Sequence, residues 1–331
     1  MYTICYVLSD NKSMFVYSEL LISVESLLVN GKHNRVVVLV DQVTIEEIGD
    51  ILLKEMQKRN VQVITVQVPE AYSQKEKSRY LKTSIRKYIS GDILYIDTDT
   101  VIVRRLPEII SNNDLAMVPE FHLQRKDVTP QRFLQWDVEQ YKKCDLQVDM
   151  EGFYFNSGVM WVRDSPKSAD FFSKWHEWWL FTRGHEVTND QISLNYVNTY
   201  IYPLISPLSD FFNVQLVQTS GQSLPIHLLG EAIIFHYFHL SDSPYALSSR
   251  EVRGKGIDDQ EIQHMIQNPY EAFIPGKIVK YDEKFEEMQK TPLFCWIKNL
   301  YHNHTRIYFF LDNVIQRLSR MKKGINDRFH H

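Results

Sequence analysis

The chain has 331 residues, 44% of them hydrophobic and 24% charged, which is enough to bury a sizeable core in one large domain or in two. Gly and Pro number 12 each, too few for a low-complexity protein. The net charge of -4 gives no sign of a nucleic-acid-binding protein, so we expect no nucleic-acid partner.

In the first hundred residues, apolar strand-like runs alternate with segments of helical spacing. Thr44 is the expected N-cap of the second helix, with Glu47 completing a capping box, and Gly91 ends the third helix. The near-continuous apolar strands are typical of an α/β protein with a mostly parallel sheet and helices on both faces. We expect strands at 2–8, 35–40, 61–66 and 93–96, and helices at 15–29, 44–59 and 73–89.

Beyond this region the regular alternation stops. The segment 120–150 is polar and mixed, and we expect an insertion or a helical lid there rather than a strand. Strand composition returns at 152–162, and a helix at 165–181 follows, with Ser165 as N-cap and Pro166 at its first position. The remaining expected elements are a short helix at 188–197, a strand at 232–240, a helix beginning at Asp258-Asp259, and a helical tail from about 282.

Polar residues gather at the expected carboxyl ends of the strands, where open parallel sheets bind ligands. They are Ser9, Asp10, Asp41, Asp97 and Asp99. Asp97 and Asp99 flank Thr98, so on an extended chain their side chains point the same way, with Cα atoms about 6.6 Å apart. Two carboxylates at this separation repel by roughly 2 kcal/mol at an effective dielectric constant near 20, and a divalent cation would reverse that repulsion. We predict a metal site, with a solvated loop of capping carboxylates as the alternative.

His236 lies in the expected strand 232–240, among apolar residues where a histidine is more often part of the core. His239 faces the other side of a regular strand, so at most one of the two histidines binds the same ion. If His236 joins Asp97 and Asp99, the set of two carboxylates and one imidazole favours Mn²⁺ over Mg²⁺.

Two further polar motifs interrupt regular elements. Asp190 and Gln191 occupy the first turn of a short expected helix, where the helix dipole alone favours an acidic residue. The functional alternative is a polar pair that binds the hydroxyl groups of a sugar. Asn156 and Ser157 interrupt an expected strand, and Gly158 permits close backbone approach, with a β-bulge as the structural alternative.

The cysteines, the N-terminus and the tail give expectations about the cellular compartment of the protein. Cys5, Cys144 and Cys295 form no metal-spaced pair, so we expect a reducing, cytoplasmic setting. The N-terminus lacks the pattern of a signal peptide, and no apolar run approaches the roughly 20 residues of a membrane span. The tail is aromatic and basic, which indicates either a solvated helix face or docking on an anionic membrane surface, at the inner face of the membrane.

Four motifs stand in a fixed order: DILYIDTDTVIV, FNSGVMWV, TNDQ and IIFHYF. With these motifs the sequence resembles the family 8 glycosyltransferases, which have the GT-A fold, a Rossmann-like, mostly parallel sheet flanked by helices. The resemblance covers roughly residues 2–245. It implies a nucleotide-sugar transferase domain at 1–245, in which 120–150 is an acceptor-side insertion or lid, and a mainly helical extension at 246–331.

The resemblance implies a retaining transferase that moves a hexose from a nucleotide sugar, usually UDP-linked, to a saccharide or lipid-linked glycan acceptor, with Mn²⁺ (or Mg²⁺) as cofactor. Under this resemblance the metal ligands are Asp97, Asp99 and His236. The residues near the nucleotide and donor are Ser9, Asp10, Asn11, Arg79 and Thr98, and those around the transferred sugar are Asn156, Asp190 and Gln191. Because the sequence offers no obvious carboxylate nucleophile and the amide of Gln191 is a poor one, we prefer same-face attack by the acceptor.

The chain departs from the family after His236. The family follows its histidine with a glycine and then Lys-Pro-Trp, whereas residues 236–245 read HYFHLSDSPY. The phosphate-binding lysine is therefore missing. The candidates to replace it are His239, Arg250, Arg253 and Lys255.

Two other functions fit parts of the sequence. DTDT matches the motif of haloacid-dehalogenase-type phosphatases, in which the first aspartate is a nucleophile. In those enzymes the motif ends the first strand, whereas here three expected strands precede the strand that ends at Asp97. The missing lysine leaves a catalytically degenerate sugar-binding protein as the other alternative.

Overall fold

The computed structural model forms two compact units, one up to Lys280 and one from Tyr281 onward. It describes residues 2–30, 35–108, 110–125, 131–149, 151–216, 226–238, 245–273 and 291–326.

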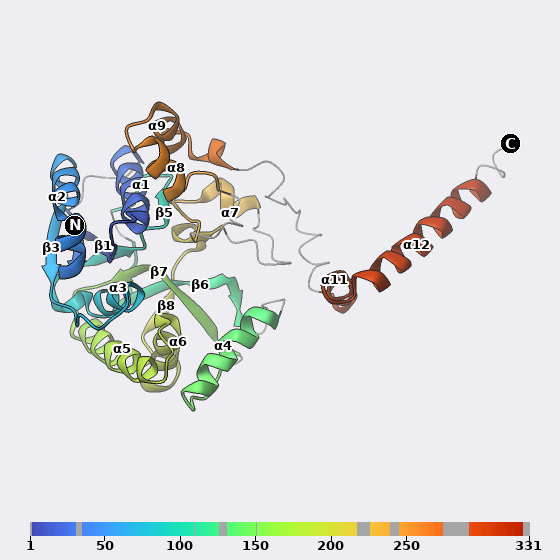
Figure 1. Ribbon diagram of the computed structural model, residues 1–331. Helices are drawn as coiled ribbons and strands as arrows, with labels where there is room; N and C mark the ends of the chain where they lie inside the picture. Colours follow the sequence, from blue (N-terminus) through green and yellow to red (C-terminus); the bar gives the residue numbers. More distant parts are fainter. Residues whose placement is uncertain are drawn as a thin grey trace. The chain divides into compact units, whose positions relative to one another are not determined.

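A seven-stranded sheet runs through the first unit, in the order β3-β2-β1-β4-β7-β6-β8 (Figure 1). Strands β3, β2, β1 and β4 pair in parallel, β7 is antiparallel to both of its neighbours, and β8 is parallel to β6. This arrangement confirms the mostly parallel α/β fold expected from the sequence. The strands are β1 (Thr3–Leu8), β2 (Arg35–Asp41), β3 (Gln62–Val66), β4 (Ile93–Ile96), β6 (Leu115–Gln124), β7 (Phe153–Val162) and β8 (Ile205–Pro207).

Helices cover both faces of this sheet, and the alternation of side chains along β1 shows why. Ile4, Tyr6 and Leu8 join one buried cluster with α1 and α2, whereas Cys5 and Val7 join another with α3 and α5. Every residue of β1 is buried, as expected for a strand covered on both sides. The helices are α1 (Phe15–Asn30), α2 (Gln42–Lys58), α3 (Gln74–Thr83) and α5 (Pro166–Gly184).

A second, three-stranded sheet has the order β5-β10-β9. Its strands are β5 (Thr100–Ile102), β9 (Val214–Gln215) and β10 (Ile234–His236). Strand β5 is antiparallel to β10, and their register places His236 opposite Thr100. The loop between β4 and β5 therefore carries Asp97 and Asp99 to the end of β10.

The remaining helices of the first unit complete its surface. Helices α8 and α9 contact α1, so the compact unit extends past residue 245. Asp259 caps α9, and Ser165 caps α5 with Pro166 in its first turn, both as expected. These other helices are α4 (Gln131–Lys143), α6 (Asp190–Tyr196), α7 (Ile226–Glu231), α8 (Ser249–Lys255) and α9 (Gln260–Gln267).

Two expected helix boundaries were wrong. Helix α2 begins at Gln42, directly after β2, because the carboxylate of Asp41 accepts the backbone N–H of Thr44 at 3.1 Å. Asp41 is therefore the N-cap in place of Thr44. Helix α3 ends at Thr83 and is followed by a 3₁₀ turn at Ile85–Lys87, instead of continuing to residue 89.

The segment 120–150 is only partly as expected. Strand β6 extends to Gln124 and pairs with β7, so the first residues of this segment are a strand after all. The polar composition hid the strand because residues 121–124, at its end, are only half-buried and so need not be apolar. Helix α4 confirms a helix over Gln131–Lys143, and residues 144–149 are not helical.

The second unit contains α11 (Pro292–Asn303) and α12 (Thr305–Asn326), which confirms the helical tail. Large apolar side chains on both helices are more than half exposed, among them Leu293, Trp296, Ile307 and Phe310. Within the described parts of the chain, no helix is both long and apolar enough to cross a membrane.

Candidate functional site

A cavity of about 900 Å³ opens where β1 and β4 end. Its wall comes from α3, the β4–β5 loop, the middle of β7, the start of α6 and the end of β10. Nine residues predicted from the sequence line it, namely Ser9, Arg79, Asp97, Thr98, Asp99, Asn156, Asp190, Gln191 and His236. The fold thus brings together side chains that lie up to 227 residues apart in the chain.

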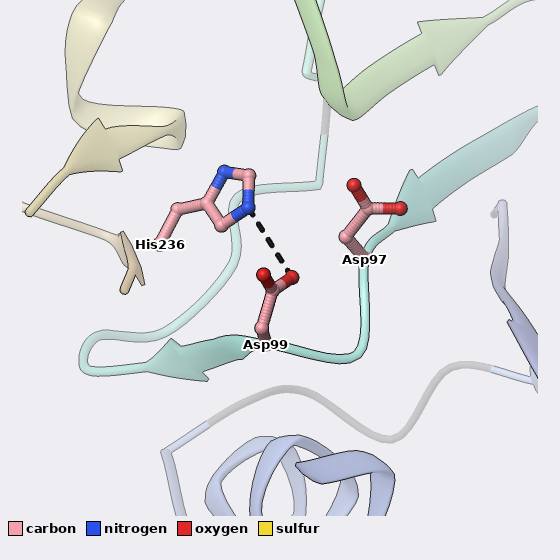
Figure 2. A group of neighbouring side chains, drawn as sticks. All are labelled: Asp97, Asp99 and His236. Atoms are coloured by element: carbon pink, nitrogen blue, oxygen red, sulfur yellow. Dashed lines mark ion pairs between the residues drawn. The ribbon is translucent and has the colours of Figure 1, made fainter. Parts of the chain in front are cut away.

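Asp97, Asp99 and His236 form one group in this wall (Figure 2). One potential ligand atom from each residue lies within 4.8 Å of the others, and Nε2 of His236 lies 3.2 Å from Oδ1 of Asp99. The backbone fixes this approach, because the N–H of Tyr237 donates to the carbonyl of Asp99 at 3.1 Å. The structure therefore has a set of two carboxylates and one imidazole arranged as divalent-metal ligands are.

Gly158 makes room for the ring of His236. A Cβ atom at Gly158 would lie 2.3 Å from Cε1 and 2.7 Å from Nδ1 of His236. On the strand side, the N–H of Asp97 donates to the carbonyl of Gly158 at 2.7 Å. The glycine is thus explained by a close approach between β7 and the group of Asp97, Asp99 and His236. The register of β7 with β6 also shifts here, between the pairs Met160–Met117 and Phe155–Pro119, so the irregularity expected as the structural alternative is present as well.

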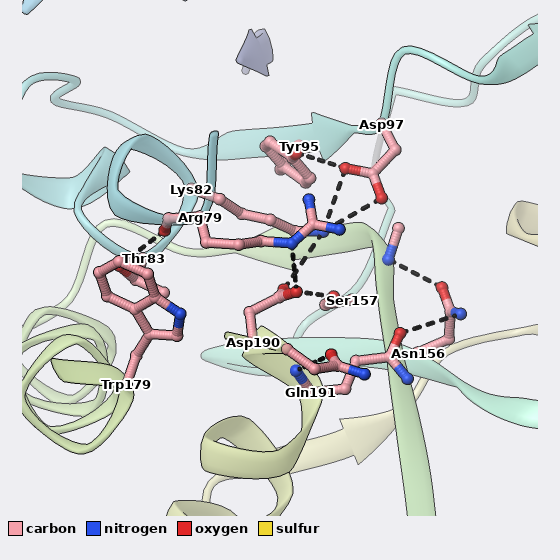
Figure 3. A network of polar contacts seen from close by, with 12 residues as sticks. Arg79, Lys82, Thr83, Tyr95, Asp97, Asn156, Ser157, Trp179, Asp190 and Gln191 are labelled. Atoms are coloured by element: carbon pink, nitrogen blue, oxygen red, sulfur yellow. Dashed lines mark hydrogen bonds and ion pairs between the residues drawn. The ribbon is translucent and has the colours of Figure 1, made fainter. Parts of the chain in front are cut away.

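Lys82 is the main cation of the site and was missed by the sequence analysis. Its side chain is 1% exposed, and its Nζ lies 3.0 Å and 3.1 Å from the two carboxylate oxygens of Asp97 (Figure 3). The same Nζ lies 3.5 Å from Oδ2 of Asp190. The hydroxyl of Tyr95 also donates to Asp97. A buried lysine therefore links Asp97 to the start of α6.

Asp190 is held as a buried anion. Arg79 Nε lies 2.7 Å from its Oδ1, and the hydroxyl of Ser157 donates to its Oδ2 at 2.8 Å. Burial alone would raise the pKa of Asp190, but Lys82 and Arg79 lower this pKa to about 2. Both oxygens of Asp190 are thus occupied by partners from α3 and β7, which orients α6 against the cavity.

A chain of amides crosses the cavity floor. Glu120 Oε2 accepts from Asn156 Nδ2 at 2.8 Å and from Gln191 Nε2 at 3.0 Å. Asn156 Oδ1 in turn accepts from Asn213 Nδ2 at 2.8 Å, and Asn213 Oδ1 lies 3.0 Å from Nδ1 of His236. Burial raises the pKa of Glu120, although the two amides act in the opposite direction. Neither Glu120 nor Asn213 was found from the sequence, because neither lies in a motif.

Only some of the residues predicted near the nucleotide line the cavity. Ser9 lines the cavity, and its carbonyl accepts from the side chain of Gln74 at 2.9 Å. Asp10 and Asn11 are not among the described residues that line it. The carboxylate of Asp10 caps α1 instead, accepting from the N–H of Tyr17 at 2.6 Å.

The candidates to replace the missing lysine also differ in position. His239 lies outside the described residues. Arg253 packs its guanidinium over the ring of Phe15, and Lys255 pairs with Glu261. The basic side chains in the cavity wall come from α3 instead, and they are Lys75, Arg79 and Lys82. Their spacing along one helix face was the available sequence signal.

The family model described as Glycosyl transferase family 8 matches residues 14–240. Among solved structures, the chain is similar to mouse xyloside xylosyltransferase 1 in its apo form, with a TM-score of 0.45 and 13% identity over 71% of this chain and 97% of that one. It is also similar to the glycosyltransferase GlyE of Streptococcus pneumoniae TIGR4, with a TM-score of 0.47 and 15% identity over 83% of this chain and 66% of that one. The chain thus spans just under two thirds of GlyE. No curated protein matches the sequence.

Proposed function

This chain belongs to glycosyl transferase family 8 and is a glycosyltransferase, and we propose that it moves a hexose from a UDP-sugar to a saccharide or lipid-linked glycan acceptor with retention of configuration. The observation that carries this proposal is the grouping of Asp97, Asp99 and His236 in the wall of the 900 Å³ cavity.

The residues present fit a divalent cation. Two carboxylates and an imidazole with ligand atoms within 4.8 Å of one another suit Mn²⁺ better than Mg²⁺, which prefers oxygen ligands alone. Asp97, Asp99 and His236 would hold the ion. When bound, Mn²⁺ supplies Lewis-acid stabilisation of the charge that develops on the diphosphate leaving group.

The cations of α3 support binding of the donor diphosphate. Lys75 and Arg79 line the cavity, and Arg79 is held in place by Asp190. These side chains are positioned to take over the contact that the family assigns to the missing lysine. Ser9 and Thr98, which line the cavity, remain our proposal for the nucleotide end of the site, with Asp10 and Asn11 next to Ser9 in the chain.

Retention is proposed to occur by same-face attack. The acceptor hydroxyl oxygen bonds to the anomeric carbon as the bond to the diphosphate oxygen breaks, and the hydroxyl proton passes to that departing oxygen. Asp190 is committed to Arg79, Lys82 and Ser157, which argues against a nucleophilic role. Oε2 of Glu120 already accepts hydrogen bonds from the amides of Asn156 and Gln191, which argues against a nucleophilic role for this oxygen. Asn156 and Gln191 are proposed to orient the sugar.

The segment 120–150 is proposed as the acceptor side. Trp136 of α4 lines the cavity while 42% exposed, so its ring has a free apolar surface at the site. An indole face packs well against the C–H groups of a pyranose ring, as aromatic side chains do with other apolar surfaces. The range 1–245 stays our proposal for the extent of the transferase domain, with 246–331 as its extension, of which α8 and α9 pack against α1 in the same compact unit.

The second unit is proposed to contact the anionic, inner surface of a membrane from the cytoplasm. Trp296 and Phe310 are 55% and 66% exposed, and Lys298 and Arg306 lie on the same two helices. Exposed aromatic residues combined with basic ones are typical of helices that lie in a membrane interface. Deleting residues 286–331 should abolish sedimentation with anionic liposomes, and a full-length protein that does not sediment with them would exclude this contact.

A donor panel tests the proposed reaction. Incubation with UDP-glucose and UDP-galactose in the presence of Mn²⁺ should release UDP, and NMR of the transferred product should show retained anomeric configuration. Tight binding of UDP-sugars without turnover, across several acceptors, would favour the degenerate sugar-binding alternative. The phosphatase alternative is not supported, since the family model matches and β4, which ends directly before Asp97, is the fourth strand of the chain. Hydrolysis of p-nitrophenyl phosphate should therefore be absent.

A further inference from the structure

We infer that Asn213 is a positioning residue that presents Nε2 of His236 to the metal and ties this ligand to the sugar end of the cavity. The inference rests on the proposed metal site, and it concerns a residue outside all four sequence motifs. Asn213 is fully buried and lies between the 3₁₀ turn Asp210–Phe212 and β9.

The chain of hydrogen bonds fixes which nitrogen of His236 carries the proton. Its starting point is a backbone N–H, that of Gly158, which donates to Asn156 Oδ1 at 2.8 Å. Because Asn156 Oδ1 is thereby an acceptor, the group of Asn213 that faces it at 2.8 Å must be the amide nitrogen. The oxygen of Asn213 then faces Nδ1 of His236 at 3.0 Å and accepts a hydrogen bond from its N–H. Nε2 points toward Asp99, 3.2 Å from its Oδ1, and is the nitrogen that the proposed ion would bind.

Packing restricts how the ring of His236 can turn about its Cβ–Cγ bond. Gly158 lies close to Cε1 and Nδ1, and the ring of Phe238 stacks on the imidazole with centroids 3.9 Å apart and an angle of 8°. The hydrogen bond to Asn213 adds a directional contact at Nδ1, which holds the orientation that presents Nε2 to Asp99. Metal-ligating histidines usually have such a partner on the other nitrogen, and it raises the basicity of the ligand.

Asn213 also connects the two ends of the site. Through Asn156, its amide leads to Glu120 and then to Gln191. Substitution to leucine removes both functions of Asn213. Substitution to aspartate keeps an oxygen for the Nδ1–H of His236 but replaces the donor to Asn156, so it separates the metal function from the sugar-side function.

The test measures Mn²⁺ affinity of the purified full-length protein by EPR of the free ion. Asn213→Leu should weaken binding roughly 10- to 100-fold, as loss of a hydrogen-bond partner of a metal ligand usually does. Asn213→Asp should stay within about threefold of the wild type, because the acceptor is retained, while its UDP-sugar turnover at saturating Mn²⁺ falls. Asn198→Leu is the matched control, since the Asn198 side chain likewise makes two hydrogen bonds, accepting from the N–H groups of Leu204 and Ile205 at 3.0 Å and 2.8 Å, away from the proposed metal site.

A second readout needs no change at Asn213. The ¹⁵N-histidine NMR signals of His236 are assigned as those that disappear in His236→Gln. In the Mg²⁺-loaded wild type, these signals should show that Nδ1 carries the proton. A proton on Nε2, or unchanged Mn²⁺ affinity in Asn213→Leu beside a wild type that binds, overturns the inference and leaves the metal site intact. A wild type that binds no Mn²⁺ overturns the metal site, and the inference with it.

Discussion

The ammonium group of Lys82 lies 3.0 Å from Oδ1 of Asp97, although the lysine side chain is 1% exposed. The same group also lies 3.5 Å from Asp190, so one buried cation serves two carboxylates. Removing one partner of a buried ion pair leaves an uncompensated charge and is strongly destabilising.

Lys82→Met should therefore lower the free energy of unfolding by about 3 to 5 kcal/mol, measured by urea denaturation. Lys174→Met is the control, because Lys174 forms a surface pair with Asp170 and is 34% exposed. The control should change the unfolding free energy by no more than about 0.5 kcal/mol. Equal effects of the two substitutions would contradict the role assigned to Lys82.

Gly158→Ala should displace the ring of His236, because the new Cβ would lie 2.3 Å from its Cε1. We expect Mn²⁺ affinity to fall at least roughly 10-fold, as misplacing a metal ligand does. Gly184→Ala is the control, since a Cβ there meets no atom within 4 Å among the described residues. EPR of free Mn²⁺ checks both variants, and normal affinity in Gly158→Ala would refute the close-approach explanation.

Asp137→Asn should change how stability depends on pH. Asp137 is 4% exposed, and burial, together with the neighbouring Glu120 carboxyl, raises its pKa to about 7. In the unfolded chain its pKa is about 3.9, so between about pH 4 and 7 the folded state holds a proton that the unfolded state lacks. This contribution makes wild-type stability fall as the pH rises through that window.

The asparagine variant lacks this titration. The free energy of unfolding of the variant minus that of the wild type should be larger at pH 8 than at pH 4, by on the order of 2 to 4 kcal/mol. Urea denaturation at both pH values measures the difference. A difference between the two proteins that does not vary with pH would show that Asp137 titrates normally.

Trp136→Ala should impair use of the acceptor but not of the donor. The indole lines the cavity and is 42% exposed, so its loss removes a packing surface without emptying the core. We expect the acceptor KM, measured with a panel of mono- and disaccharides, to rise roughly 10-fold, which corresponds to about 1.4 kcal/mol of aromatic packing. Hydrolysis of UDP-sugar should be unchanged, and Trp136→Phe should recover most of the loss. An unchanged KM would remove Trp136 from the acceptor site.

The fold was largely predictable, because its first hundred residues alternate between β-branched apolar runs and helical spacing. The errors fall at junctions. At Asp41 the strand passes into α2 without a loop, so the capping carboxylate is the last residue of the strand itself. In β6, half-buried polar residues hid the continuation of the strand to Gln124.

The residues of the candidate site could be predicted where they lie in a recognisable short sequence motif. Asp97 and Asp99 stand out because a buried strand ends on two like charges, and His236 stands out in its motif. Lys82 and Asn213 do not, because their roles arise from tertiary approach. Lys82 looks like an ordinary helix-surface lysine, and Asn213 precedes a strand of only two residues, which has no periodicity to read.

The central claim is that Asp97, Asp99 and His236 hold a divalent ion needed for transfer from a UDP-sugar. UDP release from UDP-glucose and UDP-galactose, measured against Mn²⁺ concentration for the wild type and Asp99→Asn, tests it most directly. Release should require Mn²⁺, stop with EDTA and fall at least about 100-fold in Asp99→Asn, because the metal supplies several kcal/mol of charge stabilisation. Asp170→Asn, at an exposed position, should behave as wild type. Equal UDP release by the wild type and Asp99→Asn, or release that persists in EDTA, would contradict the claim.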